Sequence, residues 1–256
     1  MKKTIIALLS LGGFASAALT DGLQWAESFG DGYDQDATFG YNNNFHAENG
    51  VGVAGGDYVN SRIWTTNLGG LFADAFTLSF NLVDFDAANW TDALSMYSNG
   101  TTYGTNHSIQ LQKSNTGNLM VYTENFTGSN VGGDASNINL GAISDLKGKQ
   151  ITLTFSGNVL TAYIDGTALA DTVTFTYAEG TTPSTTLTGF QFGAAFGSER
   201  ASNSVTVDDI YMWNRALSAD EVASLPISTT PAVPEPTTAT LSLLALAGLA
   251  ARRRRR

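Results

Sequence analysis

The sequence of 256 residues contains no cysteine. No disulfide can therefore stabilise the fold, which must depend on its hydrophobic core and, if one is bound, on a metal ion. Hydrophobic residues make up 43% of the chain and aromatic residues 11%, and both shares are too high for an intrinsically disordered protein. The composition indicates a folded protein without covalent cross-links.

Lysine and arginine are scarce, with 13 such residues against 23 aspartates and glutamates. Seven of the 13 lie at the two chain ends, as does one glutamate, so the part between has six basic and 22 acidic residues and a net charge near −16. Nucleic-acid binding depends on basic side chains that neutralise phosphates, so this charge argues against a nucleic acid as partner. Neutral partners and divalent cations suit it better.

The N-terminus has the three-part order of a secretory signal peptide. Lys2 and Lys3 precede an apolar run at residues 4–14, which is followed by small residues at 15–17. The alternative is a membrane anchor, but the run is much shorter than the roughly 20 residues that a membrane-spanning helix needs. We expect residues 1–17 to be a signal peptide that is cleaved after Ala17.

The C-terminus also has three parts in a fixed order. Pro234, Glu235 and Pro236 precede an apolar run at 239–251, and five arginines beginning with Arg252 and Arg253 end the chain. The apolar run can enter a bilayer, and arginines stay on the cytoplasmic side.

This order resembles the PEP-CTERM sorting signal of Gram-negative bacteria, and the resemblance implies several properties. Residues 233–256 would hold the protein in the inner membrane until an exosortase-type enzyme cuts near Pro-Glu-Pro and the protein reaches the envelope surface or the matrix. The alternative is a plain C-terminal anchor that is never cut. Residues 227–232 are expected to form a linker.

Alternation of apolar and polar residues with period two predicts strands that are buried on one face. The clearest runs are 75–83 and 150–164, the second with a turn at Ser156-Gly157-Asn158 that predicts a hairpin. Weaker candidates are 109–112, 119–123, 172–176 and 189–193, and the last strong one is 204–213. Helical periodicity is almost absent until Ser218, which begins a capping box with Glu221, while Leu217 and Val222 form a hydrophobic staple. The pattern predicts an all-β, antiparallel sandwich with a short C-terminal helix.

The segment from Val205 to Val222 carries a second resemblance. It reads Val-Thr-Val-Asp-Asp-Ile-Tyr-Met-Trp-Asn-Arg-Ala-Leu-Ser-Ala-Asp-Glu-Val. It resembles the closing strand, turn and helix of LamG-like, concanavalin A-like lectin and glucanase domains. The Ala-Tyr-Ile-Asp-Gly sequence at 162–166 is similar to another strand of that family. The resemblance implies a jelly-roll β-sandwich over residues 18–226.

Asp208 and Asp209 are candidate metal ligands. Counting by two places Asp209 on the side of its strand that carries Val205, Val207, Tyr211 and Trp213. A buried carboxylate needs hydrogen-bond donors or a cation. The concanavalin A-like resemblance implies a structural Ca²⁺ at this strand, whose preference is for oxygen ligands. The alternative is that both aspartates stabilise a turn through hydrogen bonds.

Carbohydrate contact is predicted where aromatic residues lie beside amides and carboxylates. The candidates, which we expect in loops, are Asn89, Trp90, Asp92, Tyr97 and Tyr103. The alternative is that the aromatic residues are ordinary core residues of a sandwich.

A catalytic site is not indicated by the residue pattern. A glycosidase normally needs two carboxylates across the scissile bond. The nearest arrangement is Asp84 with Asp86, which has no glutamate beside it and is interpreted as part of a loop after a strand. We therefore expect a non-catalytic protein of the cell surface or extracellular matrix that binds carbohydrate or a matrix polymer. A structural or adhesive envelope protein without a defined ligand is the alternative, and a glycoside hydrolase is a weaker one.

Overall fold

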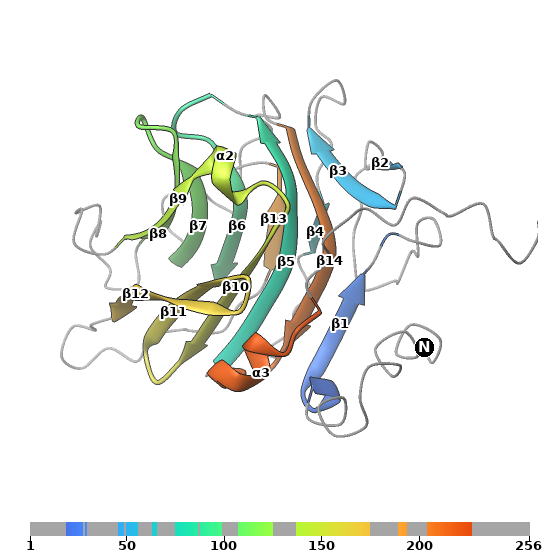
Figure 1. The fold of residues 1–256 in the computed structure, drawn as a ribbon, viewed down its shortest axis with the longest axis vertical. Coiled ribbons are helices and arrows are strands. Elements are labelled where there is room, and N and C mark those ends of the chain that lie inside the picture. The colour runs from blue at the N-terminus through green and yellow to red at the C-terminus, as the bar shows by residue number, and fades with distance from the viewer. Residues whose placement is uncertain are drawn as a thin grey trace, which may run out of the picture.

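The computed structural model describes residues 19–27, 29, 46–48, 50–55, 63–65, 75–86, 88–98, 107–124, 137–174, 189–193 and 204–226. The predicted signal peptide, linker and sorting tail lie outside these residues. The described residues form two antiparallel sheets that face each other, as predicted, with two short helices (Figure 1). No helix among them is apolar and long enough to cross a membrane.

The larger sheet has eight strands in the order β12-β11-β10-β5-β14-β3-β2, with β1 paired to β14 outside this path. Two strands pair with the edge of β14 that faces away from β5. β3 pairs with residues 204–207 and β1 with residues 210–213. The strands are β1 (Leu23–Glu27), β2 (His46–Glu48), β3 (Val51–Gly55), β5 (Ala75–Asp86), β10 (Lys149–Ser156), β11 (Val159–Ile164), β12 (Thr167–Thr174) and β14 (Ser204–Trp213).

The smaller sheet has six strands in the order β4-β13-β6-β7-β8-β9. They are β4 (Ile63–Thr65), β6 (Asp92–Ser98), β7 (His107–Lys113), β8 (Asn118–Glu124), β9 (Ile138–Ala142) and β13 (Gly189–Phe192). Helix α2 (Ile143–Leu146) follows β9 directly.

The main core lies between the two sheets and follows the alternation of the sequence. In β5, the side chains that fill it are Phe76, Leu78, Phe80 and Leu82, each at most 1% exposed. Phe80 meets Phe192 of the other sheet edge to face, with ring centroids 5.0 Å apart. Each fully buried side chain of this size contributes about 1.5–3 kcal/mol, so this layer stabilises a domain that has no disulfide.

The outer face of the larger sheet is also buried, because the C-terminal segment covers it. Thr77, Ser79 and Asn81 alternate with the core residues of β5 and are at most 2% exposed. A second hydrophobic cluster lies over this face and joins Leu19, Tyr163, Tyr211, Trp213, Leu217, Val222 and Leu225. Helix α3 (Ala219–Ala223) belongs to this cover.

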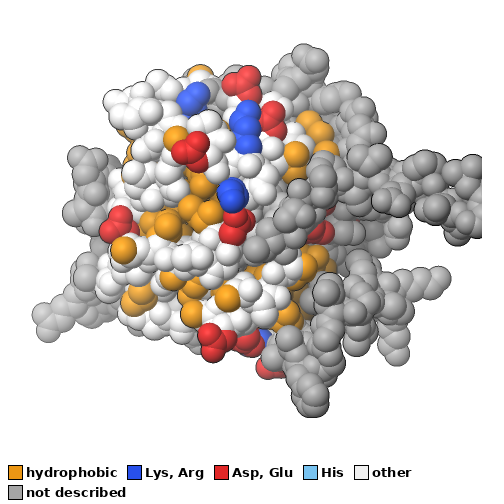
Figure 2. Space-filling model, in the orientation of Figure 1, with side chains coloured by type: hydrophobic (Ala, Val, Ile, Leu, Met, Phe, Trp, Pro, Cys, Tyr) orange, Lys and Arg blue, Asp and Glu red, His pale blue; other side chains and the backbone are white. Residues whose placement is uncertain are grey.

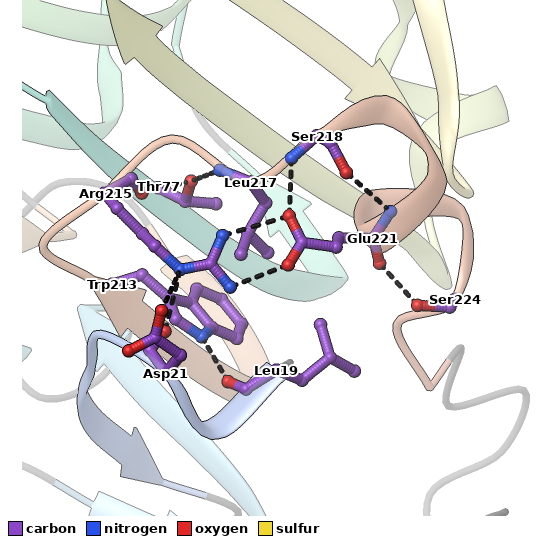
Figure 3. Close-up of polar contacts among 9 residues, drawn as sticks. All are labelled: Leu19, Asp21, Thr77, Trp213, Arg215, Leu217, Ser218, Glu221 and Ser224. Atoms are coloured by element: carbon purple, nitrogen blue, oxygen red, sulfur yellow. Dashed lines mark hydrogen bonds and ion pairs between the residues drawn. The ribbon is translucent and has the colours of Figure 1, made fainter. Parts of the chain in front are cut away.

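Helix α3 begins with the predicted capping box, which is confirmed. The Ser218 hydroxyl accepts a hydrogen bond from Glu221 N, and Glu221 Oε2 accepts one from Ser218 N at 2.8 Å. Arg215 donates two hydrogen bonds to the same carboxylate, from Nη1 to Oε2 at 2.9 Å and from Nη2 to Oε1 at 2.7 Å (Figure 3). Leu217 and Val222 lie buried in one cluster, as the hydrophobic staple predicts. The Asn-Arg-Ala-Leu-Ser segment therefore fixes a five-residue helix against the sheet.

The same turn holds the N-terminal segment. Trp213 Nε1 donates to Leu19 O at 2.6 Å, and Arg215 Nε donates to Asp21 O at 2.8 Å (Figure 3). Asn214 N donates to Gly22 O at 2.9 Å. Gly22 has φ +73°, and a Cβ there would lie 2.7 Å from Asn214 Oδ1, so the contact requires glycine. These bonds hold residues 19–22 against the turn that follows β14.

The strands with unbroken alternation were predicted correctly, including the hairpin of β10 and β11 with its turn at Gly157 and Asn158. The expectation that Asp92 and Tyr97 lie in loops is wrong, because both belong to strand β6. A register irregularity between Asp92 and Leu94 leaves two consecutive residues, Ala93 and Leu94, in the core. This irregularity hides the period-two pattern of β6 in the sequence.

Candidate functional site

One part of the outer face of the smaller sheet combines an exposed aromatic ring with hydrogen-bonded polar side chains. The core residues Leu94, Leu111 and Val121 of β6, β7 and β8 point inward. Their neighbours on the other side of each strand are therefore on the outer face. We call four residues at this place the Trp90 face, and they are Trp90, Asp92, Gln112 and Tyr122.

Trp90 lies in the turn before β6 and is 57% exposed. Its φ of +64° is the left-handed conformation, which costs a bulky residue about 1–2 kcal/mol. Hydrogen bonds hold this turn: Trp90 N donates to Lys113 O at 2.7 Å, and Thr91 Oγ1 donates to Ala88 O at 2.7 Å. The backbone therefore keeps an exposed indole in a strained position, which points to a role outside packing.

Tyr122 of β8 lies beside the indole. The two ring centroids are 6.5 Å apart and the planes are tilted by 50°. Tyr122 is only partly buried. Tyr122 lies on β8, whereas Trp90 precedes β6, and β7 lies between these two strands. The pairing of the three strands therefore determines how the two rings lie.

Asp92 organises the polar side of the face. Its Oδ1 accepts a hydrogen bond from Gln112 Nε2 at 2.8 Å, and its Oδ2 accepts one from Ser95 Oγ at 3.1 Å. Asp92 is 2% exposed, so these bonds replace the water that a carboxylate needs. The bond to Asp92 uses the amide nitrogen of Gln112 and turns its amide oxygen away from the carboxylate.

This arrangement can bind a ring that has an apolar face and polar edges. Aromatic rings contact the apolar face, and amide and hydroxyl groups pair with hydroxyls at the edge. Farther along the same face Ser95 and Gln110 are at most 5% exposed, so the open part is the Trp90 edge.

Three of the predicted contact residues come together here, and two are not placed. Asn89 is exposed next to Trp90, and Asp92 starts the following strand. The side chain of Tyr97 and all of Tyr103 lie outside the described residues. Sequence reasoning missed Gln112 and Tyr122, although period-two counting along β7 and β8 could have placed them on a shared outer face.

Period-two counting is only partly right for Asp209. Its side chain does not share the side of Val205 and Val207, but it lies beside Tyr211, whose hydroxyl donates to Asp209 Oδ1 at 3.5 Å. β14 has an irregular register between Asp208 and Tyr211, and Asp209 has φ +47°. This bulge reverses the alternation. The side chains in the inter-sheet core are Val205, Val207, Ile210 and Met212, whereas Tyr211 and Trp213 belong to the outer cluster.

Hydrogen-bond donors surround the two aspartates. Asp209 Oδ2 accepts from Asn81 Nδ2 at 3.0 Å, and Asp208 Oδ1 accepts from Asp209 N at 2.8 Å. Burial, with the charges of Asp209 and Glu27, raises the pKa of Asp208 from 3.8 to about 7. The Asp208 carboxyl therefore exchanges its proton near neutral pH.

The described residues contain no group of three or more His, Cys, Asp or Glu that could hold a metal ion. Asn81 Oδ1 is buried without a partner, which leaves one oxygen near Asp209 open to a cation or a water molecule. The donors around Asp208 and Asp209 fit the hydrogen-bonding alternative better than a Ca²⁺ ion. Calcium binding stays a prediction.

Asp84 and Asp86 lie within the end of strand β5, so their interpretation as part of a loop after a strand is wrong, and both are exposed. Asp84 forms an ion pair with Lys147 at 2.5 Å and accepts a hydrogen bond from Phe85 N. Figure 2 shows a face on which basic side chains lie beside acidic ones. Lys149 forms an ion pair with Asp165 at 2.6 Å. The contacts of Asp84 with Lys147 and Phe85 give it a structural role.

Two family models match the sequence. The trans-sialidase C-terminal domain matches residues 93–220, and the PEP-CTERM protein-sorting motif matches residues 232–256. The second match confirms the resemblance of the tail, whereas membership of the LamG-like group stays a prediction. No curated protein matches the sequence significantly.

Several solved structures share the fold. Trypanosoma rangeli sialidase in complex with sialic acid is similar with a TM-score of 0.60 and 17% identity, over 82% of this chain and 33% of that one. The binding domain of Paraclostridial Mosquitocidal Protein 1 has a TM-score of 0.52 and 15% identity, over 79% and 51%. Botulinum neurotoxin type C, in a study of its interaction with two ganglioside molecules, has a TM-score of 0.53 and 13% identity, over 81% and 51%. The chain thus spans about a third of the length of the sialidase. Identities this low show the β-sandwich fold alone.

Proposed function

The chain belongs to the family of the trans-sialidase C-terminal domain, and on this premise we propose that it is an exported, non-catalytic protein that binds carbohydrate through the Trp90 face. Its PEP-CTERM motif indicates export and a place in the cell envelope. An exosortase-type sorting enzyme is the partner of that motif.

One observation carries the proposal. Trp90 is 57% exposed in a left-handed conformation, with Tyr122 beside it and the Asp92–Gln112 pair at its edge. A protein gains no stability from holding a large aromatic ring in water at a strained φ. A ligand that stacks on the ring gives a physical reason for this arrangement.

The charge of the domain favours a neutral carbohydrate. Similar structures contain sialic acid or concern gangliosides, but a net charge near −16 repels a sialic acid carboxylate. Three of the six basic residues of the domain, Lys147, Lys149 and Arg215, are each paired with a carboxylate. We therefore propose neutral hexose polymers as the ligand class.

A glycan array with the purified chain tests the proposal. We expect binding to neutral polysaccharides, a loss of at least tenfold in affinity for Trp90→Ala, and no change for the control Thr172→Ala. Thr172 is an exposed residue of β12 in the other sheet. Equal binding by all three proteins would assign the carbohydrate contact to another surface.

A structural or adhesive envelope protein is the second candidate. It is supported by the burial of Ser95 and Gln110, which closes the middle of the outer face to a ligand. Absence of binding to any glycan on the array, at high protein concentration, would favour this candidate.

A further inference from the structure

The residues just before the predicted linker lie on the outer face of the larger sheet. The Pro226 carbonyl oxygen accepts a hydrogen bond from Gln150 Nε2 at 2.9 Å. Just before it, Val222 and Leu225 are buried against Tyr163 in the outer cluster. The linker and the sorting tail therefore start from a point that is fixed on this face.

The Trp90 face lies on the opposite side of the sandwich. Gln112 and Tyr122 alternate with core residues of the smaller sheet, and Tyr163 and Tyr211 alternate with core residues of the larger one. Figure 1 shows the two layers, with α3 in front of β5 of the larger sheet. Sheets pack about 10 Å apart, and side chains extend outward on both sides, so the two outer faces are roughly 20 Å apart.

The chain between the domain and the apolar run is too short to bring the Trp90 face round to the membrane. Twelve residues separate Pro226 from Ala239, where the apolar run begins. They span at most about 43 Å when extended, and about 19 Å as a flexible chain. A domain of about 200 residues has a radius of gyration near 17 Å, so the path around its surface to the opposite face is roughly 70 Å.

We propose that, while the tail lies in the bilayer, the domain holds its α3 side toward the membrane and presents the Trp90 face away from it. The ligand is then a carbohydrate polymer of the surrounding matrix or of another cell, and not a glycolipid of the same bilayer. The ligand part of this inference rests on the proposed function, whereas the orientation stands on the geometry alone.

Single cysteines measure the orientation directly, because the chain has none of its own. Ala219 is exposed on α3, and Ala88 is exposed in the turn that carries Trp90. The variants Ala219→Cys and Ala88→Cys, each with the tail uncut, are labelled with one dye. They are reconstituted into vesicles of phosphatidylethanolamine and phosphatidylglycerol that contain acceptor-labelled lipid.

We expect strong energy transfer to the lipid from position 219 and at least threefold weaker transfer from position 88. Equal transfer from both positions, stronger transfer from position 88, or no transfer from either would overturn the orientation. Glycan binding in solution does not enter this measurement. A protein that fails on the array but shows the expected difference refutes the proposed function and leaves the orientation standing.

Discussion

Replacing Asp208 by asparagine should stabilise the protein at alkaline pH. Asp208 is 7% exposed, and its pKa is raised from 3.8 to about 7. The neutral acid is therefore the form that the fold prefers. Its stabilising contribution is fully present below about pH 4 and is lost as the pH rises through 7. Asparagine resembles the neutral acid in shape and keeps an oxygen to accept the Asp209 N–H bond.

The size of the effect follows from the pKa difference. Each tenfold change in proton affinity corresponds to about 1.4 kcal/mol, so a rise from 3.8 to about 7 corresponds to at most about 4 kcal/mol. Local relaxation and water reduce this, and we expect Asp208→Asn to gain about 1–3 kcal/mol at pH 8.5. For a domain of this length, each kcal/mol shifts Tm by roughly 2–4 °C. At pH 4 the two proteins should agree within about 0.5 kcal/mol.

Urea unfolding followed by tryptophan fluorescence at pH 4 and pH 8.5 provides the measurement, with EDTA and with added CaCl₂. If a calcium ion binds at Asp208 and Asp209, Asp208→Asn should lower the free energy of unfolding when calcium is present, because asparagine would weaken the site. An Asp208→Asn protein that is less stable than wild type at pH 8.5, in EDTA, would refute the reasoning about the buried acid.

Three further predictions concern the turn that holds α3 and the exposed indole. Arg215→Lys should lower the free energy of unfolding by about 1 kcal/mol at pH 7. Hydrogen bonds from Arg215 lower the pKa of Glu221 from 4.5 to about 2, so this stabilisation is present above pH 4.5 and is lost toward pH 2. Urea titrations should therefore show the two proteins converging as the pH approaches 2. Trp213→Phe leaves Leu19 O without its donor and should lower the stability by about 1–3 kcal/mol in thermal melts. Trp90→Gly should be more stable than Trp90→Ala by about 1 kcal/mol, because only glycine adopts φ +64° without strain, and equal stability in urea would contradict this.

Where the alternation is unbroken, the sequence predicted the strands and their buried faces. The run from Phe76 to Leu82 forms the centre of β5, and the capping box at Ser218 starts α3. These predictions succeed because the periodicity and the cap are local properties of the chain.

Period-two counting failed at two places where one strand has an extra residue relative to its partner. Ala93 in β6 and the bulge at Asp209 in β14 each reverse the side on which later residues lie. Aspartate is among the few residues that tolerate a left-handed φ, so its presence at 209 allows a bulge but does not require one. Whether the bulge forms depends on strand pairing, because β14 pairs with β3 up to Val207 and with β1 from Ile210 onward.

Only some residues of the candidate site could be predicted from the sequence, because the others depend on strand pairing. Asn89, Trp90 and Asp92 are neighbours in the chain, so their composition marks them as a contact region. Tyr122 and Gln112 join them only through the register of β6, β7 and β8. No local pattern contains that register.

Carbohydrate binding that depends on Trp90 is the central claim, and isothermal titration of a neutral polysaccharide selected on the array tests it most directly. The account predicts measurable binding by the wild-type chain, by Asp208→Asn and by Thr172→Ala, and a loss of at least tenfold in affinity for Trp90→Ala. Wild-type affinity in a folded Trp90→Ala protein would contradict it.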